Sequence, residues 1–371
     1  EGAAKALRID WGLSLHARQV QRWAQALGRS LEKKRDREVL EYRQGVRPQC
    51  PANQTPLLVV GLDGGRVQTR KIKDDQAEDD PAASPATAVP GEHKPSESGA
   101  QAAGVAPAFA SPPANPGGPS DEPPQEEQDE EACGRWKEDK VCTISSYLPG
   151  DGKEQEPQRL VTTCVASMGD AAAFGPMARV EAERRGIRQA LLVLALSDGG
   201  NWIGPLLLKF FGNIIWIIDW FHAAERLWNC AKAAFGPGTP EAAMWGERWE
   251  AMLWHGDVAG VIAALAAESK RLGPPQKADG KEHPRRLLAQ SVGYFTKHQE
   301  HMKYPEYRAK GWPIGSGVTE AAVKQFNKRV KGTEQSWWPD RVEPILQLRA
   351  MWISQDERWD RHWANRPAYV N

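Results

Sequence analysis

Three acidic residues stand where their spacing to apolar segments could support chemistry. Asp63 ends the run VVGLD, Asp198 ends the run LVLALSD, and Glu320 lies near the start of the helical pattern GSGVTEAAVKQ. Two carboxylates at strand ends and a third on a helix form a set that can hold two divalent metal ions against a phosphodiester. The set therefore predicts metal-dependent cleavage of a nucleic acid.

The two aspartates also have a structural alternative. Each is followed by two glycines, and Asp-Gly is a common pair in hairpin turns. On the catalytic interpretation, the glycines after Asp63 let the backbone or a substrate approach closely. Arg66 and Arg70 then follow at the spacing of an extended strand, and we expect both to contact phosphate.

The segment around Glu320 combines one carboxylate with a row of cations. Residues at +4, +8 and +11 return to nearly the same face of a helix, and here they are Lys324, Lys328 and Lys331, with Arg329 nearby. A surface pair of Glu320 with Lys324 is the simpler alternative. A metal ligand followed by a phosphate-contacting ridge explains more of the pattern.

Asp219 and His222 form a further polar pair. Asp219 follows the expected strand 213–218 and rivals Asp198 as the second carboxylate. A neutral histidine near a carboxylate can hydrogen-bond to it or accept a proton, so His222 could brace Asp219 or position a phosphate. Structural packing beside Trp220 and Phe221 is an equal alternative for His222.

The apolar patterns predict an alternation of strands and helices. The expected strands cover 57–62 with an extended continuation to 72, then a segment from 134, and then 159–167, 189–196 and 213–218. The expected helices cover 171–185, 202–211, 222–235, an all-helical stretch over 240–301, the Glu320 segment and 342–353. This order is that of an α/β, ribonuclease-H-like mixed sheet with an all-helical insertion before the last catalytic helix.

The N-terminal region 1–50 reads as helical. Ser14 is predicted to cap a first helix, Gly28 to end it, and a charged helix to follow from Leu31. Two helices around a glycine suggest part of a helix-turn-helix, although many helical pairs look alike. On that hypothesis the residues facing DNA would be Arg18, Gln19 and Arg22.

Charge is distributed unevenly along the chain. Residues 74–132 hold 14 acids against one lysine, a net of −13, so the remainder holds 47 bases against 34 acids, a net of +13. The acidic segment, 74–133, has 11 prolines and almost no aromatic residues, and we expect it to be disordered. The basic remainder favours a polyanionic partner, unless its charge only keeps the surface soluble.

The composition excludes several classes of protein. None of the five cysteines forms a CxxC pair, which argues against a zinc site or a disulfide framework. No run of about 18 apolar residues and no signal peptide is visible, so we expect neither a membrane span nor secretion. The chain starts at Glu1 without a methionine, which suggests a fragment or a processed piece.

Five motifs together resemble the ISKra-type transposases of bacterial insertion sequences, which are distantly related to Mutator-like transposases. They are GLDGGRVQTR, WKEDKV, LSDGGNWI, IIDWFHAAERLW and GWPIGSGVTEAAVKQFNKRVKG, in order from about Leu57 to Trp363. The resemblance implies a DDE transposase with a core over 55–73, 134–235 and 311–365, interrupted by the helical insertion 240–305.

The resemblance also implies the ligands and partners. The catalytic and metal-binding triad would be Asp63, Asp198 and Glu320, holding two Mg²⁺ ions, with Mn²⁺ as a substitute. The implied strand order puts the fourth strand beside the first, which favours Asp198 over Asp219. Partners would be transposon ends and target DNA, bound by a homo-oligomer in the bacterial cytoplasm at the nucleoid. The alternatives are an endonuclease without strand transfer and a non-catalytic DNA-binding protein derived from a transposase.

Overall fold

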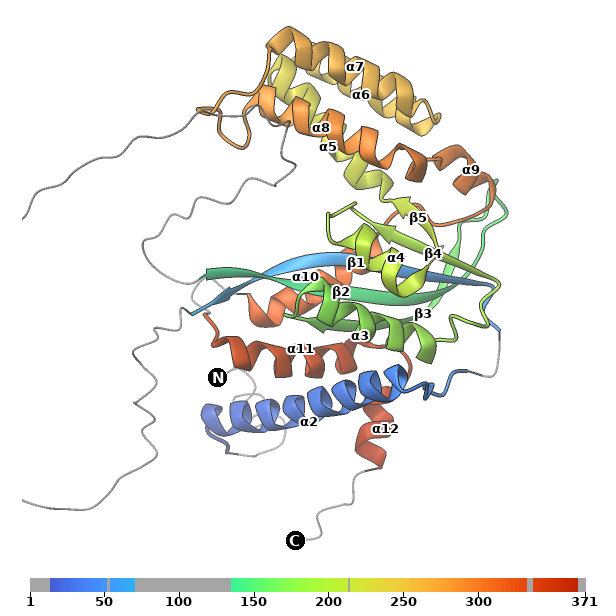
Figure 1. The fold of residues 1–371 in the computed structure, drawn as a ribbon, viewed down its shortest axis with the longest axis vertical. Helices are drawn as coiled ribbons and strands as arrows, with labels where there is room; N and C mark the ends of the chain where they lie inside the picture. The colour runs from blue at the N-terminus through green and yellow to red at the C-terminus, as the bar shows by residue number, and fades with distance from the viewer. Residues whose placement is uncertain (1–13, 52–53, 71–134, 213, 332–335, 366–371) are drawn as a thin grey trace, which may run out of the picture. The chain divides into compact units, whose positions relative to one another are not determined.

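A five-stranded mixed sheet with the strand order β3-β2-β1-β4-β5 lies at the centre of the computed structural model (Figure 1). β1 pairs antiparallel with β2 and parallel with β4, β2 pairs antiparallel with β3, and β4 pairs parallel with β5. The strands are β1 (Leu57–Thr69), β2 (Arg135–Leu148), β3 (Gln158–Ser167), β4 (Leu192–Ser197) and β5 (Ile215–Ile218).

The structure describes residues 14–51, 54–70, 135–212, 214–331 and 336–365. The acidic segment 74–133, predicted to be disordered, lies outside the described residues. The predicted α/β class and the five strands in their chain order are confirmed, and so is the position of the fourth strand beside the first with the fifth beyond it.

β1 is the central strand because its apolar run suits burial on both faces. Residues 57–62 are all buried between β2 and β4, as continuous apolar strands usually are. The sequence predicts that the buried strand ends at Asp63, but it does not. The strand runs on to Thr69, but beyond Leu62 it pairs with β2 alone.

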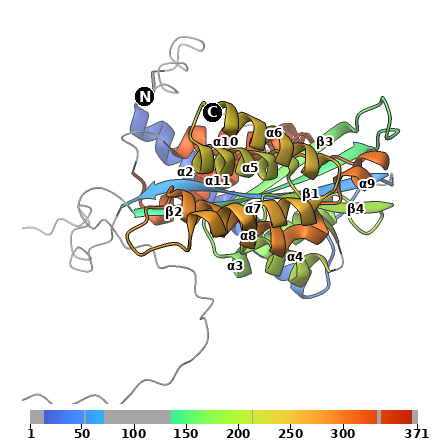
Figure 2. The same cartoon turned by 90° about the horizontal axis from the view of Figure 1, so that it is seen from above.

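Helices cover both faces of the sheet (Figure 2). On one face Leu58, Val60 and Leu62 pack against α3 (Ala171–Arg184) and α4 (Ile203–Phe211). On the other face Val67 and Val141 pack against α10 (Gly317–Val330) and α11 (Pro339–Ile353). The alternation of β1 side chains therefore divides the core into two layers.

The predicted all-helical stretch is confirmed beyond the β5 edge of the sheet (Figure 1). Its core includes the fully buried Trp249, Leu265 and Phe295 and continues onto β4 and β5. The stretch contains α6 (Pro240–Trp254), α7 (Val258–Leu272), α8 (Pro284–His298), the 3₁₀ helix η2 (Gln299–His301) and α9 (Tyr304–Ala309). It follows α5 (Trp220–Phe235), which the sequence predicts over 222–235.

The N-terminal helix differs from the prediction. A single helix, α2 (Ala17–Arg43), begins after His16, whose side chain caps it in place of Ser14. Gly28 lies buried inside this helix, because α2 packs along α11 and the glycine faces Pro344 (Figure 1). The predicted break at Gly28 is therefore wrong.

Without that break the described segment is not the predicted pair of helices around a turn. Contact of DNA with Arg18, Gln19 and Arg22 stays a prediction. The last described helix, α12 (Arg358–Ala364), follows α11. No helix in the described part of the chain has the length and apolar character needed to cross a bilayer. The four cysteines within the described ranges are unpaired.

Replacing Gly28 tests the packing of α2 on α11. A Cβ at Gly28 would lie 2.1 Å from the carbonyl oxygen of Pro344, a backbone atom that cannot rotate away. Gly28→Ala should therefore lower the free energy of unfolding, since overpacking costs about 1–3 kcal/mol. Urea denaturation measures the change.

Gly293→Ala is the matched control. Gly293 also lies inside a helix, α8, but an added Cβ there meets no atom within 4 Å. This substitution should stabilise the protein by up to about 1 kcal/mol, through helix propensity alone. Equal gains for the two variants would contradict the close contact at Gly28.

Candidate functional site

Three aspartates line up at the carboxyl ends of the parallel strands. The parallel pairing of β1 with β4 ends at Leu62 opposite Ser197, and that of β4 with β5 ends at Ser197 opposite Ile218. Neighbouring strands are roughly 4.8 Å apart, so the next residues along each strand lie side by side. These residues are Asp63, Asp198 and Asp219.

α10 brings Glu320 to the same edge. Thr319 packs onto β1 and β2, where its hydroxyl lies 2.8 Å from that of Thr143. A Cβ on Gly61 would lie 1.9 Å from the Thr319 hydroxyl oxygen, so this approach requires a glycine. Glu320 follows directly in the first turn of α10. The helix thus delivers its carboxylate beside the strand that carries Asp63.

Asp63 lies within electrostatic range of both Asp198 and Glu320. Burial, and then the charges of Asp198 and Glu320, raise the pKa of Asp63 to about 6, although the Gly64 N–H and His222 act in the opposite direction. The Gly64 N–H donates to Oδ1 of Asp63 at 2.7 Å. The structure therefore brings together Asp63, Asp198 and Glu320, the three residues that the sequence selects.

Asp219 has a different environment from the other two aspartates. Its side chain is fully buried and caps α5, with Oδ1 accepting the backbone N–H of His222 at 3.0 Å. Oδ2 accepts the backbone N–H of Ser316, just before α10. Burial alone would raise the pKa of Asp219, but the hydrogen bonds from His222 and Ser316 lower it. Asp219 thus ties β5, α5 and the entry to α10 together.

His222 lies between two acids. Its Nδ1 is 3.6 Å from Oδ2 of Asp219 and 3.7 Å from Oε1 of Glu320. These distances are longer than hydrogen bonds, and the buried Nδ1 has no hydrogen-bond partner within the described ranges. Asp219 first, and then Glu320 and Asp198, raise the pKa of His222 to about 9 against the effect of burial.

Asp219, His222 and Glu320 form a group that could hold a metal ion. Each offers one ligand atom, and these atoms all lie within 4.8 Å of one another. The group shares only Glu320 with the predicted metal set, in which Asp63 and Asp198 are the other ligands. Asp219, the rival of Asp198 as second carboxylate, and His222 thus lie beside Glu320.

The negative charge of the cluster is only partly compensated. Among the described residues, the cations within 4 Å of its carboxylates are His222 and Lys324, and the Lys324 ammonium lies 3.4 Å from Oε2 of Glu320. Asp63 and Asp198 have no such partner in that part of the chain. Oxygen ligands with uncompensated charge suit a hard divalent cation.

The Asp198 loop is held by α8. The hydroxyl of Tyr294 donates to the backbone carbonyl of Asp198 at 2.9 Å, and Lys297 donates to the side chain of Asn201 at the same distance. Gly199 has a φ of +86°, and a Cβ there would lie 3.1 Å from Nε2 of His298. The helical insertion thus fixes the loop that carries the second acid.

No local sequence signal identifies this role of α8. Tyr294 is separated from Asp198 by 96 positions, and the contact exists only in the folded chain.

A fifth acid near the site, Asp139, is absent from the sequence prediction. Asp139 is on β2, opposite Gly65 of β1, and faces the same side of the sheet as Asp63. Its side chain is fully buried, and neither carboxylate oxygen has a hydrogen-bond partner within the described ranges. Burial, and then Glu138 and Asp63, raise its pKa to about 6. Its only sequence signal is an acid at a buried position of a strand.

The basic ridge on α10 is shorter than predicted. Lys324 is 78% exposed and pairs with Glu320, so the simple surface pair is present. Lys328 and Arg329 are exposed on the same helix. Lys331 lies beyond the end of α10 in an extended conformation, with its ammonium 5.5 Å from the centre of the Trp136 ring. The prediction of Lys331 on the same helical face is therefore wrong.

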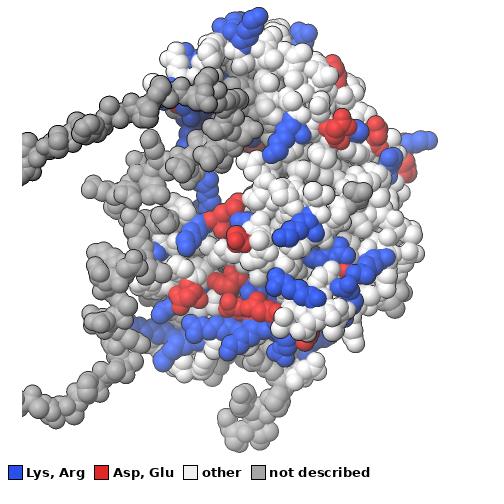
Figure 3. All heavy atoms as spheres, viewed as in Figure 1, with Lys and Arg blue, Asp and Glu red and all other residues white. Residues whose placement is uncertain are grey.

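Arg66 in β1 and Arg70, just after it, differ in their surroundings. Arg66 is exposed. Arg70 contacts the segment after α10. Its Nε donates to the carbonyl of Ser336 at 3.3 Å, and its guanidinium lies 5.6 Å from the centre of the Trp338 ring. Figure 3 shows acidic side chains gathered on the face seen there, with lysine and arginine side chains flanking them.

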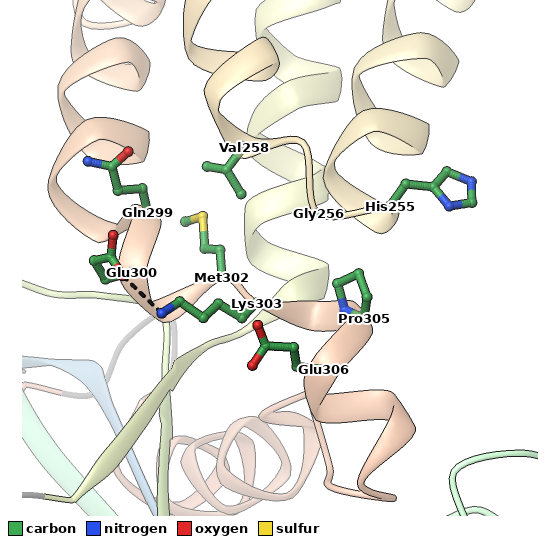
Figure 4. A pocket seen from close by; sticks show the side chains of 9 residues that line it. All are labelled: His255, Gly256, Val258, Gln299, Glu300, Met302, Lys303, Pro305 and Glu306. Carbon is green, nitrogen blue, oxygen red and sulfur yellow. Dashed lines mark ion pairs between the residues drawn. The ribbon is translucent and has the colours of Figure 1, made fainter.

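A cavity of about 340 Å³ opens elsewhere, between the α6–α7 turn and the segment from η2 to α9 (Figure 4). Its lining includes Met302 and the ion pair of Glu300 with Lys303, at 3.0 Å. None of the cluster acids lines it. The acidic cluster, and not this cavity, is therefore the candidate site.

Comparisons with known proteins leave the family open. The chain matches no family model, and a search of curated proteins finds no match. The resemblance to ISKra-type transposases thus rests on the motifs quoted from the sequence.

The raised pKa of His222 predicts a pH-dependent contribution to stability. The contribution is fully present below the unfolded pKa of about 6.5 and is lost as the pH rises through about 9. In metal-free protein, His222→Asn should therefore cost most stability near pH 6 and least near pH 10. Denaturation by urea in the presence of EDTA across this range measures the difference.

The exposed His255, in the turn after α6, supplies the control variant His255→Asn. A deficit of His222→Asn that has the same size at both ends of the pH range would contradict the assigned interaction with Asp219 and Glu320.

Proposed function

We propose that the chain is a DDE-type transposase, which cleaves DNA at the ends of an insertion sequence and joins the freed strand to a target. The observation that carries the proposal is the meeting of Asp63 and Asp198, just after the parallel pairing of β1 with β4 ends, with Glu320 from α10. A set of this kind suits two-metal cleavage of a phosphodiester.

The arrangement of the sheet supports the same proposal. The strand order is β3-β2-β1-β4-β5, and β2 runs antiparallel to the other four strands. This arrangement fits a ribonuclease-H-like core. The helical insertion lies between the second and third acids along the chain, in the position that the resemblance implies. The insertion also favours a transposase over a minimal endonuclease.

The donor atoms of the cluster fit divalent cations in two ways. The all-oxygen set of Asp63, Asp198 and Glu320 suits two Mg²⁺ ions, whereas a set that includes His222 suits Mn²⁺ better. The uncompensated charge of the cluster supports binding of either ion. When bound, the ions would supply neutralisation of the phosphodiester charge and water of lowered pKa.

The protein's own residues would prepare this site. Asp219 uses both carboxylate oxygens on backbone N–H groups, so we assign it the positioning of His222 and of the α10 entry. His222, protonated at neutral pH in the metal-free protein, offsets part of the charge between Asp219 and Glu320. A metal ion that displaces this proton from His222 would bind more strongly at higher pH, because less of the histidine is then protonated.

Replacing the three acids tests the proposed activity. Asp63→Asn, Asp198→Asn and Glu320→Gln should each reduce metal-dependent cleavage of DNA that carries the element's own ends. The reduction should exceed the roughly 10–100-fold typical of residues outside the ligand set. Gel analysis of cleavage and strand-transfer products measures it.

Glu300→Gln, which removes an acid of the distant cavity, is the control and should cut normally. Cleavage without strand transfer would favour an endonuclease, and binding without cutting would favour a non-catalytic DNA-binding protein. Undiminished cleavage by Asp63→Asn would show that the site is assigned wrongly.

A second comparison separates Asp198 from Asp219. Asp219→Asn places an amide donor where Oδ2 accepts the Ser316 N–H, and losing that bond in a buried place costs about 1–3 kcal/mol. We expect this variant to unfold at lower urea. Asp198→Asn should unfold normally and instead need more Mg²⁺ for cleavage.

Urea denaturation without metal and a Mg²⁺ titration of cleavage measure the two effects. The reverse pattern, with the metal defect confined to Asp219→Asn, would make Asp219 the second ligand.

A further inference from the structure

Arg226 lies one turn after His222 on α5, where this helix packs against α8 (Figure 1). The centre of its guanidinium is 4.3 Å from the centre of the Tyr294 ring, in a cation–π stack. The hydroxyl of the same tyrosine donates to the carbonyl of Asp198. A single aromatic ring thus joins Arg226 to the loop of the second acid.

Tyr294 contacts both Arg226 and the Asp198 loop, and its pKa is affected by the charges on both sides. Burial raises the pKa of Tyr294, Arg226 lowers it, and Asp198 and Asp219 raise it further. The ring is therefore within electrostatic range of the arginine and of two acids of the site.

Arg226 nevertheless has no ion pair or hydrogen bond within the described part of the chain. Two of the other stacked arginines use their donors within the protein. Arg308 lies over Trp254 and donates to the carbonyl of that residue, and Arg271 lies over Phe235 and donates to Glu268. Arg226 is thus oriented by stacking on the tyrosine that holds the Asp198 loop, while its N–H groups stay available.

We propose that Arg226 binds a backbone phosphate of the DNA strand that enters the acidic cluster. The planar guanidinium can donate two parallel hydrogen bonds to one phosphate, which a lysine cannot do. Stacking on Tyr294 fixes the fork before DNA arrives, so less side-chain freedom is lost on binding. The inference rests on the proposed function for its substrate class, and it adds a contact absent from the sequence prediction.

The test measures DNA affinity as a function of salt, in EDTA, by fluorescence anisotropy of a labelled duplex and a labelled single strand. Each phosphate contact contributes about 1 to the slope of log K against log salt. Arg226→Gln should lower the slope by roughly 1 and weaken binding about tenfold at low salt. Arg226→Lys should keep the slope and lose part of the affinity.

Arg248→Gln is the matched control. Arg248 also stacks on an aromatic ring in the helical insertion, at 5.2 Å from that of Trp245, but it belongs to α6 and not to the cluster. Its removal should leave the slope unchanged. Tyr294→Phe keeps the stacking ring and should bind like the parent, whereas Tyr294→Leu should lose affinity as Arg226→Gln does.

The outcomes separate this inference from the proposed function. Equal slopes for Arg226→Gln and the parent would overturn the inference. The proposed function would still stand or fall by the cleavage assay of the acid variants. A slope lowered only in Arg226→Gln would support it even if no metal-dependent cutting were found. Failure of the parent chain to bind either DNA would overturn both.

Discussion

The contact of Thr319 with Gly61 determines the position of the third acid. α10 can lie this close to β1 only because Gly61 has no side chain. Since Glu320 follows Thr319 directly, and Asp63 lies two residues after Gly61 on the same face, the contact sets the separation of the two carboxylates. Packing of Phe326 and Val330 against the sheet keeps the helix in place.

This packing holds like charges together at an energetic cost. Asp63 is ionised less readily than a free carboxylate because of its burial and its acidic neighbours. Asp219, at the same edge of the sheet, avoids this cost because its carboxylate accepts hydrogen bonds from two backbone N–H groups. Two aspartates at the same sheet edge thus differ in character, since one is satisfied by the fold and the other remains available to a ligand.

The sequence predicts the parts of the structure that depend on local patterns. The apolar runs before Asp63 and Asp198 mark buried strands, and each acid directly follows its run, although β1 continues beyond Asp63. The predicted break at Gly28 is wrong because a glycine suggests a helix end, whereas here it admits the backbone of Pro344. Contacts such as that of Tyr294 with Asp198 join distant segments and leave no local pattern.

The hairpin of β1 and β2 has a modular character. Thr69 and Arg135, which flank residues 70–134, are cross-strand partners in register. Chain ends that already face each other can be closed by a turn as short as two residues. The β1–β2 junction is therefore a point where segments of very different length can be exchanged in evolution or by design without shifting the register that carries Asp63.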